Sequence, residues 1–233
     1  MYQFNTVGYV QSPYREKFAI PRQPGLVSSA QGRLILTDDY NRQECIAGLE
    51  DFSHIWIQFV FHATAEQGWK PKVRPPRLGG NRKVGIFATR STFRPNPIGL
   101  SVVKLEEILY EDKHWQLVIS GLDLLDKTPV LDIKPYIAYS DALTEVSSGF
   151  AQEAPQQQMP VNFSPQALKQ LDRYHSQYPQ LKLLIEQVLA QDPRPAYRQH
   201  KDDNKTYGMQ LYQLNIRWQV MAQEAVVTAV SDC

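Results

Sequence analysis

Short apolar or alternating segments, separated by turn residues, fill the first 140 residues of this 233-residue chain. Successive side chains of a β-strand point to opposite faces, so alternation over roughly four to eight residues predicts half-buried strands. Seven segments fit this pattern: residues 4–10, 33–36, 53–61, 84–88, 101–108, 115–122 and 130–137. Among them only residues 40–49 are typical of a helix, and no strand–helix–strand rhythm appears. The sequence therefore predicts a mainly β domain, closed as a barrel or a sandwich.

The composition changes after residue 140, where Ser, Gln, Ala and Pro become frequent. We expect a first domain over residues 1–140, a linker over 141–161 and a second domain over 162–233. Ser164 followed by Pro165 is typical of a helix start, and a second helical pattern over 181–190 ends at prolines, which cannot continue a helix. Alternating segments after residue 207 predict strands. The second domain is thus predicted to be small and α+β.

Charge is distributed unevenly along the chain. Residues 67–105 contain nine basic residues and no Asp or Glu, although the formal net charge of the whole chain is only +1. The rest of the chain has 16 basic residues against 24 acidic ones, a difference of −8. A polyanion would be attracted to this segment and repelled elsewhere. The alternative is a solvated basic loop balanced by acidic neighbours in space.

Several functional classes lose support. The glycine-rich nucleotide loops and the common hydrolase and metalloprotease motifs are absent. Cys45 and Cys233 are too few for a disulfide framework or a zinc site, so we expect no metal. The longest apolar run, residues 55–61, is far short of the roughly 20 residues that span a bilayer, and no secretory signal pattern opens the chain. We expect a soluble, cytoplasmic protein without a membrane segment.

The run Thr89–Gly99 suits the recognition of an anion. Prolines on both sides of Asn96 hold the backbone outside helix and sheet, and Arg90 and Arg94 project from this stiff frame. A guanidinium grips a carboxylate or phosphate through two hydrogen bonds. The alternative is a rigid structural turn.

Two other places offer titratable side chains. His62 follows an apolar strand, and strand ends are where functional sites collect. Asp123, Asp126 and Asp132 interrupt a later pair of strands. Asp132 and Lys134 are two residues apart, which places them on one strand face as a candidate ion pair.

The motifs together closely resemble the TrmO family, also called TsaA or YaeB, in its bacterial long form. They are the segments 8–14, 17–25, 48–56, 94–99, 131–136 and 192–198. The resemblance implies a single-sheet β-barrel, acting as a homodimer, that uses S-adenosylmethionine to methylate N6 of N6-threonylcarbamoyladenosine at position 37 of threonine tRNA. Such a barrel would explain the missing glycine-rich fingerprint.

The resemblance also implies the cofactor contacts, several of them through the main chain. They are expected at Pro24, Gly25, Leu26, His62, Ala63, Arg90, Leu100, Leu122, Asp123, Leu124 and Leu125. Asp132 or His62 is the candidate general base, and positioning of the acceptor nitrogen by hydrogen bonds alone is an equal alternative. The candidate tRNA contacts are Arg74, Arg77, Arg94, Arg194, Tyr197 and Arg198. Two other functions stay open: an RNA-binding protein without a cofactor and a small-molecule methyltransferase.

Overall fold

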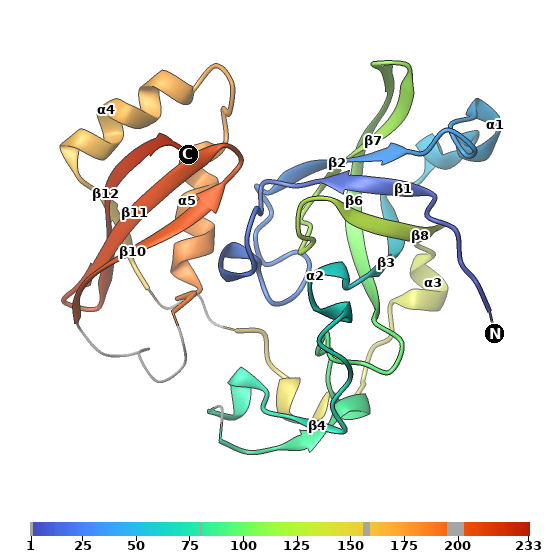
Figure 1. Ribbon diagram of the computed structural model, residues 1–233, viewed down its shortest axis with the longest axis horizontal. Helices are drawn as coiled ribbons and strands as arrows, with labels where there is room; N and C mark the ends of the chain where they lie inside the picture. The colour runs from blue at the N-terminus through green and yellow to red at the C-terminus, as the bar shows by residue number, and fades with distance from the viewer. Residues whose placement is uncertain (1, 80, 156–158, 195–202) are drawn as a thin grey trace.

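A computed structural model describes residues 2–79, 81–155, 159–194 and 203–233 (Figure 1). Six strands of the N-terminal half share one sheet: β1 (Gly8–Gln11), β2 (Gln31–Leu36), β3 (His54–Val60), β6 (Ile98–Glu111), β7 (His114–Ser120) and β8 (Thr128–Pro135). They pair in the order β1–β2–β7–β6–β3–β8, and β8 also pairs with β1, so the antiparallel sheet closes into a barrel. The prediction of a mainly β protein is confirmed.

Strand β3 illustrates how alternation specifies this sheet. Ile55 and Ile57 are 0% exposed and Phe59 is 5% exposed, whereas Trp56 and Gln58 between them are partly exposed. Ile57 lies opposite Ser101 on β6 and Ile133 on β8. A slip of one residue would turn the apolar set outward, so burial fixes the register.

Residues 61–97 leave the barrel between β3 and β6. They form α2 (His62–Ala65), β4 (Lys72–Val73), η3 (Pro76–Leu78), β5 (Val84–Gly85) and η4 (Ile86–Ala88), with β4 paired to β5. The prediction of a strand over 84–88 was wrong beyond Gly85. Ile86 is buried and Thr89 N donates to Ile86 O, so the chain turns there instead of extending.

The other short elements of this half are η1 (Lys17–Ala19), α1 (Gln43–Ile46), η2 (Leu49–Asp51), α3 (Ala138–Asp141) and η5 (Gly149–Ala151). The helix expected over residues 40–49 is shorter than predicted, because Gly48 adopts a φ of 83° that separates α1 from η2. This left-handed conformation is one that glycine tolerates and other residues rarely adopt.

The C-terminal half consists of β9 (Val161–Phe163), α4 (Pro165–Tyr174), α5 (Leu181–Ala190), β10 (Asp203–Leu211), β11 (Leu214–Met221) and β12 (Glu224–Asp232). Its sheet has the order β10–β11–β12–β9, with β9 parallel to β12. Helix α4 begins as predicted: the Ser164 side chain accepts a hydrogen bond from Ala167 N, and Pro165 occupies the first helical turn.

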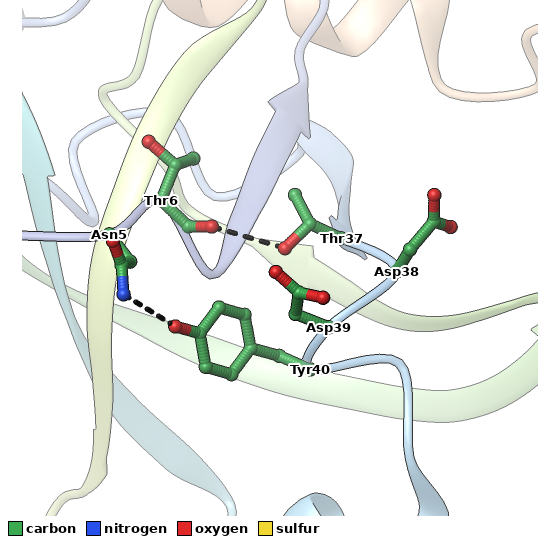
Figure 2. A pocket seen from close by; sticks show the side chains of 6 residues that line it. All are labelled: Asn5, Thr6, Thr37, Asp38, Asp39 and Tyr40. Carbon is green, nitrogen blue, oxygen red and sulfur yellow. Dashed lines mark hydrogen bonds between the residues drawn. The ribbon is translucent and has the colours of Figure 1, made fainter.

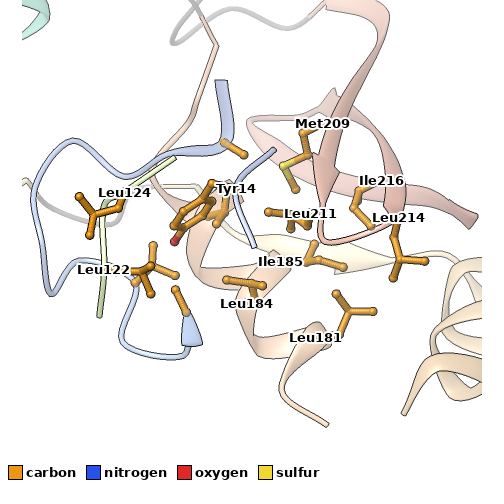
Figure 3. Packing of buried hydrophobic residues seen from close by; sticks show 14 of the residues in the cluster. Tyr14, Leu122, Leu124, Leu181, Leu184, Ile185, Met209, Leu211, Leu214 and Ile216 are labelled. Carbon is orange, nitrogen blue, oxygen red and sulfur yellow. The ribbon is translucent and has the colours of Figure 1, made fainter. Parts of the chain in front are cut away.

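The two halves share one hydrophobic cluster (Figure 3). Tyr14, which is 0% exposed, forms an isolated β-bridge with Leu211 of β10. Tyr212 N donates to Pro13 O at 2.7 Å, and Gln210 N donates to Glu16 Oε1 at 3.0 Å. The segment after β1 is therefore held by the C-terminal sheet as well as by the barrel.

Candidate active site

The topology brings the predicted site residues to one end of the barrel. Neighbouring strands are antiparallel, so the ends of β1, β3 and β7 lie at the same rim as the starts of β2, β6 and β8. The connections at this rim are residues 12–30, 61–97 and 121–127. They contain every expected cofactor residue except Leu100, which is the third residue of β6.

The first and last of these connections touch through two glycines. Gly25 N donates to Gly121 O at 2.8 Å, and Gly121 N donates to Ala30 O at 2.9 Å. Their φ angles are 79° and 69°, and a Cβ added at Gly121 would lie 3.6 Å from Gly25 Cα. A Cβ added at Gly25 would meet nothing within 4 Å. Gly25 therefore leaves its backbone open to a ligand on the side away from Gly121.

Arg90 faces the same loop. Its Nη1 donates to Gln23 Oε1 at 2.6 Å, and its side chain is exposed. Arg94 plays a different part, since it is partly buried and its Nη1 donates to Thr89 O at 2.7 Å. Arg94 thus fixes the turn that presents Arg90, whereas the exposed guanidinium of Arg90 is accessible to a carboxylate or phosphate.

Asp123 is the carboxyl group of this rim whose pKa responds to the charge of Arg90. Its Oδ1 accepts a 2.6 Å hydrogen bond from the hydroxyl of Ser101, which is 2% exposed. Burial raises the pKa of Asp123 to about 6, and the bond from Ser101 and the charge of Arg90 lower it. The rim therefore combines an exposed cation with a partly buried carboxyl that titrates near neutral pH.

His62 and Leu100 lie beside the start of β6. His62 is the first residue of α2 and is partly buried; the preceding Phe61 N donates to Pro97 O at 2.7 Å. Leu100 is 52% exposed and lies opposite Gln58, which also lies opposite Asp132 on β8. Leu100, Gln58 and Asp132 therefore form one row across three neighbouring strands on the outside of the barrel. At a strand spacing of about 4.8 Å, the backbones of Leu100 and Asp132 are about 10 Å apart.

Asp132 forms the predicted pair with Lys134, at 2.9 Å between Oδ2 and Nζ. Its Oδ1 also accepts from Ile133 N at 2.9 Å. The Asp132 side chain is 46% exposed, so its carboxylate is held in place yet accessible.

The basic segment supplies cations and aromatic rings beside the rim. Arg74 and Arg77 are exposed, and Arg77 Nη2 also donates to Glu153 O. Lys70 Nζ lies 4.0 Å from the centre of the Phe93 ring, so a cation already covers one face of that ring. Phe87 is 79% exposed, and the Arg94 guanidinium carbon lies 5.8 Å from the centre of its ring.

The C-terminal candidates are only partly described. Arg194 is 2% exposed, and its Nε donates to Asp192 Oδ1 at 2.7 Å. This burial opposes the expected direct contact between Arg194 and tRNA; the arginine instead closes the turn after α5. Tyr197 and Arg198 lie outside the described residues.

A separate depression of about 460 Å³ lies away from this rim (Figure 2). Its walls are Asn5, Thr6, Thr37, Asp38, Asp39 and Tyr40, where Asn5 Nδ2 donates to Tyr40 Oη at 3.0 Å. It contains two carboxylates, no cation and none of the predicted site residues. It therefore does not suit an anionic partner, and we place the site at the rim instead.

Comparison with known proteins identifies the family. Residues 9–142 match the tRNA-methyltransferase O N-terminal domain, and residues 156–233 match the TrmO C-terminal domain. The tRNA (adenine(37)-N6)-methyltransferase of Escherichia coli (strain K12) is 54% identical over 94% of this chain and 93% of its own length. A crystal structure described as TrmO from Pseudomonas aeruginosa has a TM-score of 0.82 at 38% identity, and the match covers 99% of this chain and 98% of that chain.

This chain belongs to the TrmO family. A further relative from Pseudomonas aeruginosa (strain PAO1), named putative S-adenosylmethionine-dependent methyltransferase RcsF, is 48% identical over 91% of this chain and 90% of its own length. Membership in the TrmO family makes the chain a methyltransferase with S-adenosylmethionine as methyl donor.

The rim of this TrmO-family chain fits that cofactor chemically. Arg90 matches the carboxylate of the methionine part, and the Asp123 carboxylate matches its ammonium group or a ribose hydroxyl. Leu122 and Leu124 are 0% and 1% exposed, so a ligand beside them meets their backbone rather than their side chains. Among the described residues no group of three or more His, Cys, Asp or Glu is placed to hold a metal ion. In the same described ranges, no helix has both the length and the apolar character needed to traverse a membrane.

Sequence reasoning did not find Ser101, Gln23 and Phe87. Ser101 and Gln23 act through residues that were predicted, Asp123 and Arg90, and nothing in the sequence marks them. Phe87 carried a weak signal, because an aromatic residue between Ile86 and Ala88 in an acid-free segment fits a platform as well as a strand.

Proposed function

We propose that this chain methylates N6 of N6-threonylcarbamoyladenosine at position 37 of threonine tRNA, beside the anticodon. One observation supports this most directly. Arg90, Asp123 and the open Gly25 backbone meet at one rim, and Arg90 is one of nine cations in a segment without acids, in a chain 54% identical to a tRNA (adenine(37)-N6)-methyltransferase. The proposal includes the domain division 1–140, 141–161 and 162–233, a homodimer and a cytoplasmic location.

The cofactor would be held by groups of this rim. Arg90 binds the methionine carboxylate, and Asp123, fixed by Ser101, binds a cationic or hydroxyl group. The backbone at residues 24–26 and 122–125, with His62, Ala63 and Leu100, forms the walls. S-adenosylmethionine supplies an electrophilic methyl group, and the rim contributes by holding the acceptor nitrogen in line at about 3 Å while excluding water.

The acceptor nitrogen lies between a purine and a carbonyl, so it must lose its proton as the methyl group arrives. Asp132 is suited to accept that proton, since its carboxylate is accessible, is fixed by Lys134 and shares a row with Leu100. His62 is the second candidate. We expect Asp132→Asn to lower kcat by about 100-fold with the Kd of S-adenosylmethionine unchanged, as measured by single-turnover methylation and calorimetry. A normal rate for this variant would eliminate Asp132 as the base.

The tRNA would approach along the basic segment. Exposed anticodon-loop bases are recognised by stacking and edge contacts, and phosphates by cations. Arg74 and Arg77 are placed for phosphates. Arg94 donates a hydrogen bond to Thr89 O, so it stabilises this surface and is not placed to bind the carboxylate of the threonyl group.

The deciding experiment is mass spectrometry of nucleosides after incubation of the purified protein, S-adenosylmethionine and threonine tRNA. A gain of one methyl group on N6-threonylcarbamoyladenosine is expected, and tRNA lacking the threonylcarbamoyl group serves as the control substrate. An unchanged nucleoside profile would contradict the proposal. If the protein binds tRNA and no cofactor, the result would favour a non-catalytic RNA-binding protein. If it binds the cofactor and shows no salt-dependent binding of tRNA, the result would favour a small-molecule methyltransferase. Light scattering of the purified protein tests the homodimer.

A further inference from the structure

The loop that carries Pro24, Gly25 and Leu26 is held by the C-terminal half of the chain. Gln187 Oε1 accepts hydrogen bonds from Ser29 N at 3.0 Å and Ser29 Oγ at 2.8 Å, and Gln187 Nε2 donates to Ser28 Oγ at 3.2 Å. Gln191 Nε2 donates to Leu26 O at 3.3 Å. Four hydrogen bonds therefore connect two glutamines to one loop.

The two glutamines share a helix face. They are four residues apart, Gln187 within α5 and Gln191 as its C-cap, and that spacing places side chains one above the other. The helix itself is immobilised, since Leu184, Ile185 and Leu189 are at most 1% exposed. Each amide group therefore projects from a rigid element.

The buried residues of α5 and of the second cofactor loop belong to one hydrophobic cluster. Leu122 and Leu124 belong to the same buried cluster as Leu184 and Ile185, with Tyr14 also within it (Figure 3). The loop at 122–125 therefore shares one buried cluster with the C-terminal half, and the loop that carries residues 24–26 is hydrogen-bonded to that half.

The loop needs this support because it has little order of its own. Residues 21–30 form bends and turns without a helix or strand, and Gly25 is at a φ of 79°. Within the N-terminal half three backbone hydrogen bonds hold this loop: Gly25 N donates to Gly121 O, Ala30 N donates to Val27 O, and Ala30 O accepts from Gly121 N. A loop held so sparsely pays an ordering cost on ligand binding unless another element fixes it beforehand.

We propose that Gln187 and Gln191 are positioning residues that preorganise the cofactor loop, so that the C-terminal domain sets the affinity of the barrel for S-adenosylmethionine. The inference rests on the proposed function, because it takes the cofactor to bind at residues 24–26. It assigns the C-terminal domain a role in cofactor binding that does not depend on any contact with tRNA.

The full-length double variant Gln187→Ala with Gln191→Ala tests the inference. Loss of four hydrogen bonds to the loop is expected to weaken S-adenosylmethionine binding about 5- to 20-fold by isothermal titration calorimetry. KM for the cofactor should rise equally, while kcat at saturating cofactor and KM for tRNA stay unchanged. Hydrogen exchange of residues 21–30 should accelerate in the free variant and recover when S-adenosylmethionine is added.

Gln170→Ala is the matched control. It removes a glutamine of the same half, whose Oε1 accepts from Val230 N at 2.8 Å and which does not contact the loop. The conservative variant Gln187→Glu retains the acceptor for Ser29 and should bind the cofactor more tightly than Gln187→Ala. If the double variant fails to fold, Gln191→Ala alone, which removes the bond to Leu26 O, gives the same comparison.

The outcomes separate the inference from the proposed function. Equal cofactor affinity and equal loop exchange in the double variant and in the Gln170→Ala control would overturn the inference alone. A wild-type protein that binds no S-adenosylmethionine would overturn the proposed function instead. A double variant with raised KM for tRNA and unchanged cofactor affinity would also contradict the inference, since α5 would then act on the nucleic acid.

Discussion

The partly buried carboxyl of Asp123 should lower the free energy of unfolding of the ligand-free protein. Its pKa is raised from an ordinary 3.8 to about 6, chiefly by burial, so the fold favours the protonated form. Asp123→Asn replaces the group with an amide of similar size that still accepts the hydrogen bond from Ser101. The variant therefore removes the ionisation and leaves the packing and the hydrogen bond in place.

The size and sign follow from proton linkage. Between pH 3.8 and about 6 the folded state binds more protons than the unfolded chain, so stability falls as pH rises through this window and is flat above it. At about 1.4 kcal/mol per tenfold change in proton affinity, the penalty is at most about 3 kcal/mol, and partial solvent access reduces it to about 1–3 kcal/mol. Asp123→Asn should be more stable than the wild type by that amount at pH 8, and equal to it near pH 3.5.

Urea unfolding followed by tryptophan fluorescence, at several pH values and without ligand, measures this difference. The same variant should bind S-adenosylmethionine at least about tenfold more weakly at pH 8, because the cationic ligand loses its charged partner. Asp126→Asn is the control in the same loop. Its carboxylate is paired with Arg15 and accepts from Ser12 N at 3.0 Å, so its loss should destabilise the protein. A stability difference between Asp123→Asn and the wild type that does not vary with pH would refute the reasoning.

Three other perturbations test separate parts of the site. Arg90→Ala should weaken S-adenosylmethionine binding by about 10- to 100-fold in calorimetry, with Arg90→Lys in between; unchanged affinity would remove Arg90 from the cofactor site. Phe87→Ala should raise KM for tRNA by about 5- to 10-fold in steady-state methylation and leave cofactor affinity intact, whereas Tyr110→Ala, an exposed aromatic at the opposite barrel end, should change neither. Tyr14→Phe should keep or raise the melting temperature, because Tyr14 Oη is buried without a hydrogen-bond partner among the described residues; a loss of several degrees would reveal a partner.

The sheet was predictable because burial of one face makes apolar and polar residues alternate along each strand. The alternation in β3 leaves one face apolar, and β3 lies close to its predicted limits; in β8 a register shift interrupts the alternation, and the strand begins two residues before its predicted start. The start of α4 was predictable for a different local reason, since Ser164 and Pro165 carry the capping chemistry themselves. Residues 84–88 show the limit of such reasoning: a run of Val, Ile and Phe fits a strand, but the chain turns after Gly85, where Thr89 N donates to Ile86 O.

The site was predictable only in part. The motifs indicated Arg90 and Asp123, and the topology brings both to one rim. The sequence does not show that Arg94 is committed to Thr89 O or that Arg194 is buried against Asp192, because a guanidinium that braces a turn looks the same in sequence as one that binds a ligand. The support of the cofactor loop by Gln187 was equally hidden, since the two segments are 158 residues apart.

The acid-free segment and the recessed carboxyl of Asp123 meet opposite electrostatic requirements. A tRNA phosphate needs a surface without negative charge, whereas a sulfonium cofactor with an ammonium group gains from a carboxylate nearby. Residues 67–105 contain no Asp or Glu, and the nearby carboxyl, Asp123, is recessed, bonded to Ser101 and close enough to Arg90 for its pKa to respond. Protonation adds a pH dependence, because a carboxyl with a pKa of about 6 is partly neutral near pH 6, and a further cation beside it favours the charged form. Binding of S-adenosylmethionine should therefore release a proton at pH 6, detectable as a buffer-dependent enthalpy that is absent in Asp123→Asn. An enthalpy that is the same in buffers of different ionisation heat would mean that Asp123 does not face the cofactor.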